Sequence, residues 1–291
     1  MPAGLVFIDK PQGWTSHDIV AKLRGIAGTR RVGHAGTLDP MATGLLVLGI
    51  DAGTKLLTFL VGANKTYEAR IRLGANTVTD DAEGDITSTA DASSITKSQI
   101  ETALEALRGE IMQVPSSVSA IKVDGERAYA KVRGGDEVKL AARPITIHKF
   151  EVIGEPVVVD RFLDFDAIID CSSGTYIRAL ARDLGAALGV GGHLTALRRT
   201  KVGQYSVADA QAMEDLTKDS LRITPLAAAA ISNFEKFVLD EQGVIDLRHG
   251  KKLNGAISSE LAAAVFGDDL IAMIEPAGEK LKSVVVFAED K

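Results

Sequence analysis

The chain has 291 residues and a formal net charge of −6, a length that predicts one large domain with a small appendage. Its single cysteine, Cys171, excludes an internal disulfide bond and any metal site built from several cysteines. The acidic balance taken alone disfavours a nucleic-acid partner, although phosphate binding depends on local basic surfaces and not on the total. No apolar run reaches membrane-spanning length and no signal peptide opens the chain, so we expect a cytoplasmic protein without a membrane partner.

The first elements in chain order are a strand and a helix. Residues 5–9 form a short apolar run that ends at a turn. Thr15 and Asp18 have the spacing of a capping box, and the apolar stripe that follows stops at Gly28. This pattern predicts a helix that leads to Arg30, Arg31 and the loop after them.

The loop from Gly33 to Gly44 contains a histidine, an aspartate and several glycines between two regular segments. Pro40 fixes its own φ and disfavours the helical region for Asp39, so the carboxylate of Asp39 is expected on a stiff corner. A structural turn explains the same pattern, because Asp-Pro and Gly-Thr are ordinary turn sequences. From spacing alone the turn is the favoured interpretation.

The segment after the loop predicts a buried strand over 45–50, a short helix over 54–60 and a strand over 65–73 with one face in water. The last of these alternates strictly between apolar and charged residues, which is typical of an antiparallel strand with one face in water. Tyr67 lies on its apolar face. Considered without other information, Tyr67 is a core residue.

The remaining elements follow the same reasoning. They are a helix from a Thr96–Gln99 capping box to Gly109, an extended segment over 113–124, a short helix over 126–133, strands over 145–152 and 162–171, and a helix that follows residues 172–175 and ends at Gly189. The acidic loop 79–85 lacks the glycine and glutamate of a calcium loop, so we exclude calcium there. After an alanine-rich stretch at 226–230, strand candidates over 238–239, 270–274 and 284–287 predict a small β-rich appendage.

Motifs for cofactors are missing from the sequence. It has neither a Walker motif nor a dinucleotide fingerprint nor a nucleophile elbow, and its five histidines do not have metal-ligand spacing. We therefore expect no cofactor and no metal. Asp39 remains as a carboxylate that could attack an electrophilic sugar centre. Such a carboxylate needs a nearby cation to stay ionised, and Arg178 is the candidate.

Several blocks of sequence resemble the bacterial tRNA pseudouridine-55 synthase family in their order and spacing. The blocks are Lys10-Pro11-Gln12-Gly13 with Thr15-Ser16, Gly33 to Pro40, Lys65-Thr66-Tyr67, Gly174 to Arg178, and His193 to Thr200. The resemblance spans roughly residues 4–205. It implies an enzyme that isomerises uridine to pseudouridine at position 55, in the T-loop of tRNA, with no protein partner.

The resemblance implies a role for each matching residue. Asp39 would cleave the N-glycosidic bond after the base is flipped out, so that the uracil rejoins the ribose through C5. Tyr67 would stack on the uracil, Arg178 would pair with Asp39, and His34 would enter the RNA loop. The other implied substrate-binding residues are Tyr176, Leu197, Lys10, Arg30, Arg31, Arg198 and Arg199. Whether Asp39 attacks the ribose, adds to the uracil or promotes elimination to a glycal stays open.

The implied fold is α+β, with a central, largely antiparallel sheet flanked by helices. Residues 1–230 would form the catalytic domain, with an RNA-clamping insertion at about 123–143 that becomes ordered on RNA binding. Residues 234–291 would form a small RNA-binding module of PUA type. Two rivals are a glycosidase that uses Asp39 with Asp51, and an RNA chaperone that opens the T-loop without chemistry.

Overall fold

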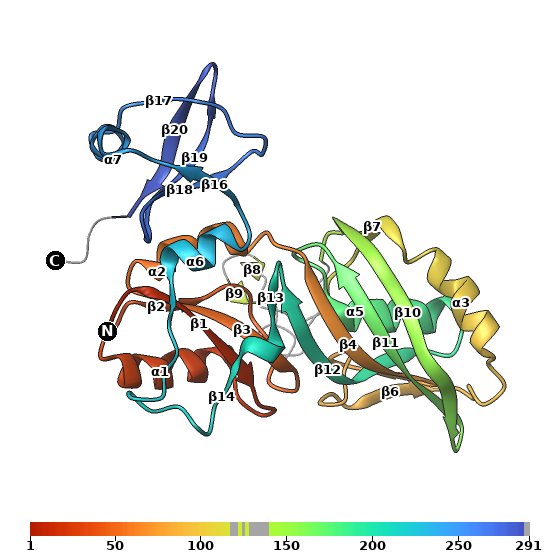
Figure 1. Ribbon diagram of the computed structural model, residues 1–291. Helices are drawn as coiled ribbons and strands as arrows, with labels where there is room; N and C mark the ends of the chain where they lie inside the picture. The colour runs from red at the N-terminus through yellow and green to blue at the C-terminus, as the bar shows by residue number, and fades with distance from the viewer. Residues whose placement is uncertain (117–121, 124–125, 128–139, 288–291) are drawn as a thin grey trace. The chain divides into compact units, whose positions relative to one another are not determined.

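The computed structural model describes residues 1–116, 122–123, 126–127 and 140–287 (Figure 1). The chain forms two compact units. The first contains residues 1–40, 44–62 and 201–291, and the second contains residues 41–43 and 63–200. Most of the predicted insertion at 123–143 lies outside the described residues. Of the helix predicted over 126–133, the two described residues instead form a strand, β9 (Glu126–Arg127), which pairs with β8 (Lys122–Val123).

The first unit begins with a small sheet and three helices that contact it. Its elements up to residue 231 are β1 (Gly4–Lys10), α1 (Ser16–Ala27), β2 (Val32–His34), β3 (Thr43–Ile50), α2 (Gly53–Leu60), β13 (Tyr205–Ser206), η1 (Val207–Asp209), β14 (Gln211–Ala212), β15 (Thr224–Pro225) and α6 (Leu226–Ile231). Strand β1 pairs antiparallel with β3 and β15 and parallel with β14, and β2 pairs antiparallel with β3. The predicted capping box is present at Thr15, and Gly28 ends α1 in the left-handed conformation, at φ 68°.

Helix α1 covers one face of β1 and β3 (Figure 1). The apolar stripe predicted for this helix supplies Ile19, Val20 and Leu23, which pack against Leu46 and Leu48 of β3. Strand β3 is buried along nearly its whole length, which explains its continuous apolar sequence. The helix and sheet together fix the frame from which the loop containing Asp39 projects.

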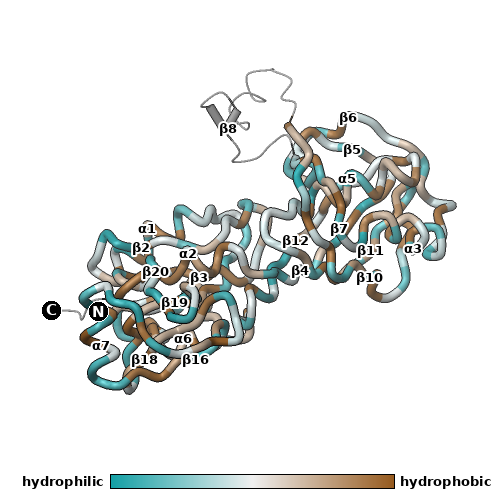
Figure 2. Tube along the Cα trace, turned by 90° about the horizontal axis from the view of Figure 1, so that it is seen from above, coloured by the Kyte–Doolittle hydropathy of each residue, from teal (hydrophilic) through white to brown (hydrophobic). Residues whose placement is uncertain are grey.

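The last part of the first unit is β-rich, as predicted. It consists of β16 (Glu235–Val238), α7 (Glu241–Arg248), β17 (Leu253–Asn254), β18 (Ala262–Phe266), β19 (Asp269–Ala277) and β20 (Lys280–Val286). The strand order is β16-β18-β19-β20-β17. Strand β18 is buried and is coloured as hydrophobic in Figure 2. The core of this β-rich part also includes residues of α7, a helix that the sequence did not predict.

Within its described residues, the second unit is a largely antiparallel sheet with two helices. Its elements are β4 (Lys65–Leu73), β5 (Ala75–Thr77), β6 (Ile86–Thr89), α3 (Lys97–Glu105), β7 (Gly109–Gln113), β10 (Arg143–Val159), β11 (Phe162–Cys171), α5 (Ile177–Ala187) and β12 (Gly192–Val202), whose last two residues belong to the first unit. The strand order is β12-β4-β11-β10-β7. Helix α5 contacts β4, and α3 contacts both β10 and α5. These sheets and helices confirm the predicted α+β class.

The alternation predicted for residues 65–73 is confirmed in β4. Its apolar face is buried, and its charged face makes bidentate ion pairs with β11, from Arg70 to Asp166 at 2.7 and 2.9 Å and from Arg72 to Asp164 at 2.7 and 2.6 Å. These pairs lie directly opposite each other in the strand register. The register therefore holds Tyr67 on the buried face. No helix among the described residues has both the length and the apolar character needed to cross a membrane.

Candidate active site

Asp39 is half-buried between two anchored neighbours in the first unit. On one side, the amide of Leu38 donates to Ser16 Oγ at 2.9 Å, and that hydroxyl lies 3.2 Å from the carbonyl oxygen of Leu38. On the other side, the carbonyl of Pro40 accepts from the amide of Gly13 at 2.8 Å. The backbone on both sides of the carboxylate is thus tied to the start of α1 and to the turn before it.

Lys10 adds a second tie to Pro40. Its side chain is fully buried, and its ammonium group donates to the carbonyl oxygens of Pro11, Trp14 and Pro40 at 3.0, 2.7 and 3.3 Å. A buried cation needs such partners to offset its lost hydration. Lys10 was predicted to bind substrate, whereas its observed contacts hold the loop that carries Asp39.

His34 ends the short strand β2 on the approach to the same loop. It pairs with Leu48 of β3, and the next amide, that of Ala35, donates to the carbonyl of Val47 at 2.9 Å. The His34 ring lies 6.4 Å from the exposed His17 ring, edge to face. The structure therefore places His34 and Asp39 on one short, anchored segment of the first unit.

In the second unit, Tyr67 and Leu197 lie on neighbouring strands, β4 and β12, and are 7% and 8% exposed. Two hydrogen bonds join these strands. Thr200 Oγ1 donates to the carbonyl of Thr66, and Thr195 Oγ1 donates to the carbonyl of Arg70. This pairing indicates an antiparallel register. That register places Leu197 beside Ala69, next but one to Tyr67 on the buried face. The two residues form part of one apolar wall.

Arg178 lies in the first turn of α5 and is 5% exposed. Its Nη1 donates to the carbonyl of Thr79 at 2.8 Å and to Ser116 Oγ at 3.4 Å, and it lies 3.4 Å from the carboxylate of Asp81. Asp81 comes from the acidic loop over 79–85, for which the sequence predicts no calcium site. The sequence named Asp39 as the acidic partner of this arginine and did not identify Asp81.

Tyr176 precedes α5 and is held through its backbone. Its amide donates to Gln113 Oε1 at 2.9 Å, and its carbonyl accepts from Gln113 Nε2 at 3.0 Å. Gln113 is buried at the end of β7. The start of α5 is therefore tied to β7 as well as to the acidic loop, and the half-buried Tyr176 side chain is presented from a fixed backbone.

The predicted basic residues fall into two groups. Arg30 and Arg31 are exposed, and Arg31 makes a long contact of 3.6 Å with Asp51. On β12, Arg198 is half-buried and Arg199 is only 1% exposed. Successive side chains of a strand point to opposite faces, so Arg198 and Arg199 cannot line one surface together. Both were expected to bind substrate, and the burial of Arg199 corrects that expectation for this residue.

A second buried lysine, Lys65, lies near Arg199 in the second unit. Burial, and then the charge of Arg199, lowers the pKa of Lys65 to about 8. Its ammonium group donates to the carbonyl of Ala63 at 2.7 Å, and Cys171 lies opposite it on β11. Burial also raises the pKa of the Cys171 thiol to about 11, so this cysteine is not a reactive thiolate at neutral pH.

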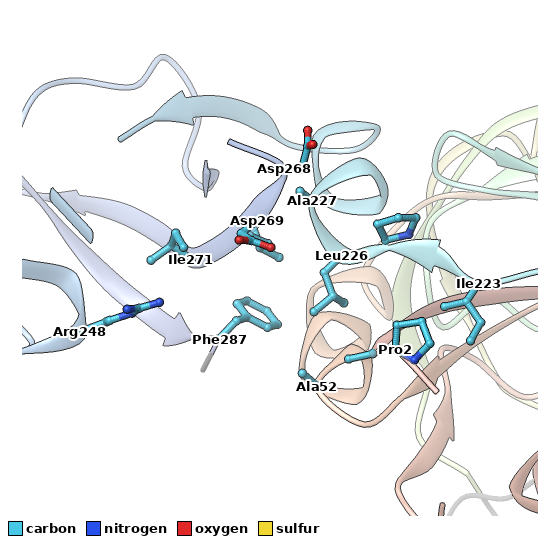
Figure 3. Close-up of a pocket in the computed structure, with 13 residues that line it drawn as sticks. Pro2, Ala52, Ile223, Leu226, Ala227, Arg248, Asp268, Asp269, Ile271 and Phe287 are labelled. Carbon is cyan, nitrogen blue, oxygen red and sulfur yellow. The ribbon is translucent and has the colours of Figure 1, made fainter. Parts of the chain in front are cut away.

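The first unit also contains a cavity of about 400 Å³ that is remote from Asp39 (Figure 3). Its lining includes Pro2, Ala52, Arg248, Asp269 and Phe287. Pro2 and Ala52 adjoin the end of the sheet where Gly4 pairs with Ile50, whereas the loop of Asp39 is tied to the opposite end, at Lys10. Six residues of strand at about 3.3 Å each separate these ends by roughly 20 Å. The cavity is thus not the site of Asp39.

Comparison with known proteins gives matches along the whole chain. Residues 24–177 match the TruB family pseudouridylate synthase N-terminal domain, and residues 178–231 match the tRNA pseudouridylate synthase B C-terminal domain. A tRNA pseudouridine synthase B of Arthrobacter sp. (strain FB24) is 54% identical, with 99% of this chain and 97% of the relative covered. One of Streptomyces griseus subsp. griseus is 55% identical, with 99% and 98% covered. A chain of a solved Cbf5-Nop10-Gar1 complex matches with a TM-score of 0.71 at 26% identity, covering 99% of this chain and 84% of that one.

Proposed function

Because the chain belongs to the TruB family of pseudouridylate synthases, we propose that it converts the uridine at position 55, in the T-loop of tRNA, into pseudouridine. Family membership makes the chain an isomerase and confirms the resemblance that its motifs indicated. The relatives are named as tRNA enzymes, which supports tRNA as the substrate. We propose the cytoplasm as the place of reaction.

The proposed reaction is an isomerisation that needs no other reactant. With Asp39 as the essential carboxylate, the bond between ribose C1′ and uracil N1 breaks, the uracil turns, and a bond forms between C1′ and C5. The proton on C5 leaves to solvent and N1 gains one. Attack on ribose, addition to uracil and elimination to a glycal all begin from the same carboxylate, and the release of the C5 proton is common to them.

The observation that carries this proposal is the anchoring of Asp39. Catalysis gains when a reacting group is held in place before the substrate arrives, and a misplacement of about 1 Å can cost about a hundredfold in rate. The hydrogen bonds from Ser16 to Leu38 and from Gly13 and Lys10 to Pro40 fix the backbone on both sides of Asp39.

The second unit supplies residues suited to a flipped uracil. Tyr67, with Leu197 on the neighbouring strand, offers an apolar wall, and stacking of a base on an aromatic ring contributes about 1–3 kcal/mol. Tyr176 would add to this wall from the start of α5. A flipped base costs a few kcal/mol of lost stacking in the RNA, so these contacts together offset most of that cost.

Arg178 is proposed to keep Asp39 ionised. Its guanidinium contacts Asp81, Thr79 and Ser116, and these contacts fix the position of the positive charge. A fixed guanidinium favours the charged form of a neighbouring carboxylate. Losing one partner of a buried ion pair costs about 3–5 kcal/mol, so changes at Arg178 should affect the integrity of the site as well as the rate.

RNA binding is assigned to the remaining predicted residues. His34 would enter the T-loop, Arg30, Arg31 and Arg198 would contact phosphates, and residues 123–143 would close over the RNA. Residues 234–291 would act as a PUA-type module. This last assignment is supported by exposed cations at the end of α7 and along β20, which are Arg248, Lys251, Lys252, Lys280 and Lys282. Local basic surfaces of this kind can bind RNA despite an acidic total.

The glycosidase rival fails on geometry. A pair of catalytic carboxylates must be about 5–9.5 Å apart. Asp51 follows the end of β3 that pairs with Gly4, and the loop of Asp39 is tied to the end that pairs with Lys10, roughly 20 Å away along the strand. Asp51 instead accepts a hydrogen bond from Thr29 at 2.8 Å.

The test is tritium release from unmodified tRNA transcript labelled at C5 of uridine. Wild-type protein should release tritium from one T-loop position, and Asp39→Asn should release none while still binding the tRNA. If neither protein releases tritium but both bind and open the T-loop, the chaperone rival is correct. Release from a uridine outside the T-loop would refute the proposed position.

A further inference from the structure

Trp14 is the only tryptophan of the chain. It lies in the turn between β1 and α1, where its side chain is 37% exposed. The residues around it in sequence, Gln12, Thr15 and His17, are polar and exposed. More than a third of this large aromatic side chain thus faces solvent, and aromatic side chains with an exposed face are enriched at binding surfaces.

The backbone of Trp14 shares its anchors with the loop of Asp39. The ammonium nitrogen of Lys10 donates to the carbonyl of Trp14 at 2.7 Å and to that of Pro40 at 3.3 Å. The amide of the preceding residue, Gly13, donates to the same Pro40 carbonyl. One ammonium group thus bridges the residue after Asp39 and Trp14, so the two side chains start from adjoining stretches of backbone.

The ring of Trp14 is also held. Lys22 Nζ lies over it, 5.5 Å from the ring centroid, and the same nitrogen donates to the carbonyl of Met213 at 3.0 Å. That hydrogen bond fixes the cation, and the cation favours one orientation of the indole. No hydrogen bond to the indole N–H is formed by the described residues. Trp14 is therefore an oriented, partly exposed aromatic surface with a cation beside it.

We propose that Trp14 is a stacking platform for an unpaired base of the substrate RNA, next to the nucleotide that reacts at Asp39. This inference rests on the proposed function. Every nucleobase has a face that can stack on an aromatic ring, and flipping one nucleotide out of a loop leaves its neighbours with unsatisfied stacking. Lys22 supplies positive charge beside the ring for the backbone phosphate of that base.

The single tryptophan makes a direct binding test possible, because the indole emission reports on position 14 alone. Asp39→Asn protein, which binds without turnover, is titrated with unmodified tRNA transcript, and accessibility of the indole is measured with acrylamide as a neutral quencher. Stacking predicts that saturating tRNA quenches the emission and shields the indole from acrylamide. An indole that stays as accessible in the complex as in the free protein would overturn the inference.

The activity test compares three variants with wild-type protein. Trp14→Ala should raise KM for tRNA by about five- to tenfold and leave kcat within about twofold. The expected change in KM lies at the lower end of the range for a stacked base, because Lys22 already covers part of the ring. Trp14→Phe keeps an aromatic face and should stay within about twofold of wild type. Ile231→Ala removes a similarly exposed apolar side chain, 42% exposed at the end of α6, and should change neither constant.

The outcomes separate this inference from the proposed function. Tritium release by wild type with equal KM values for Trp14→Ala and Trp14→Phe refutes the stacking role and leaves the enzyme standing. No tritium release by wild type refutes the function, whatever the fluorescence shows. A fall in kcat alone in Trp14→Ala, with indole shielding absent, would make Trp14 a support of the Asp39 loop and would also refute the inference.

Discussion

Ser16→Ala removes the hydroxyl that holds the loop beside Asp39. Ser16 is 2% exposed and Leu38 is 3% exposed, so water cannot readily replace the lost group. The substitution leaves the amide and the carbonyl of Leu38 each without its Ser16 contact, and a buried polar group without a partner costs about 1–3 kcal/mol. The loop will relax in part, so we expect a loss of about 2–3 kcal/mol in the free energy of unfolding. Loss of position should lower kcat by about ten- to a hundredfold.

Urea denaturation measures the first effect, and single-turnover tritium release at saturating tRNA measures the second. Ser232→Ala is the matched control, because its hydroxyl also donates to a backbone carbonyl, that of Ala228 at 2.9 Å, but at an exposed position. Its loss should cost less than about 0.5 kcal/mol. If Ser16→Ala matches this control in stability and wild type in kcat, the anchoring of Asp39 by Ser16 is not what organises the loop.

Asp81→Asn should destabilise the protein by about 3 kcal/mol or more, because the buried Arg178 loses a charged partner. Asp80→Asn is the matched control, because burial raises the pKa of Asp80 and the arginine that pairs with it is partly exposed. We expect this control to change the free energy of unfolding by no more than about 1 kcal/mol. Equal losses for the two variants in urea denaturation would contradict the role of Asp81. Lys65 has an ordinary pKa of 10.5 and a native pKa of about 8, so the unfolded state binds more protons and stability should rise by up to about 1 kcal/mol between pH 8 and 9. Lys65→Met should abolish that rise in stability. The measurement stops at pH 9, because the raised pKa of Cys171 lowers the stability as the pH rises further. The same dependence of stability on pH in both proteins would show that Lys65 is not the source of the rise.

Local sequence patterns predicted most of the regular structure correctly. The capping box at Thr15 and the glycine stop at Gly28 depend on neighbours within one turn of helix, so the start and end of α1 follow from sequence alone. The alternation of residues 65–73 likewise placed Tyr67 on the buried face of β4. The β-rich character of the last sixty residues was also predicted, but strand β18, with three alanines, carried too weak a strand signal to be found.

The contacts that organise the candidate site could not be predicted, because they join residues far apart in sequence. Ser16 meets Leu38 and Asp81 meets Arg178 only once the strands and helices between them have packed. The acidic loop was tested against a local calcium pattern, and a local pattern has no means of indicating a distant arginine. Arg199 is different, since alternation along β12 was readable and would have separated it from Arg198.

The order of segments along the chain bears on how the protein is made. The second unit is complete once residue 200 has been synthesised, whereas the first unit needs residues 201–291 to join a strand made at the very start. Strand β1 finds its partners β14 and β15 only after residues 211–225 have emerged from the ribosome. Translation at about 5–20 residues per second leaves that amino-terminal strand with an unpaired edge for about 10–40 s. The part of the chain that is born first is therefore the part that finishes folding last, and chaperones that guard nascent chains would meet it in that interval.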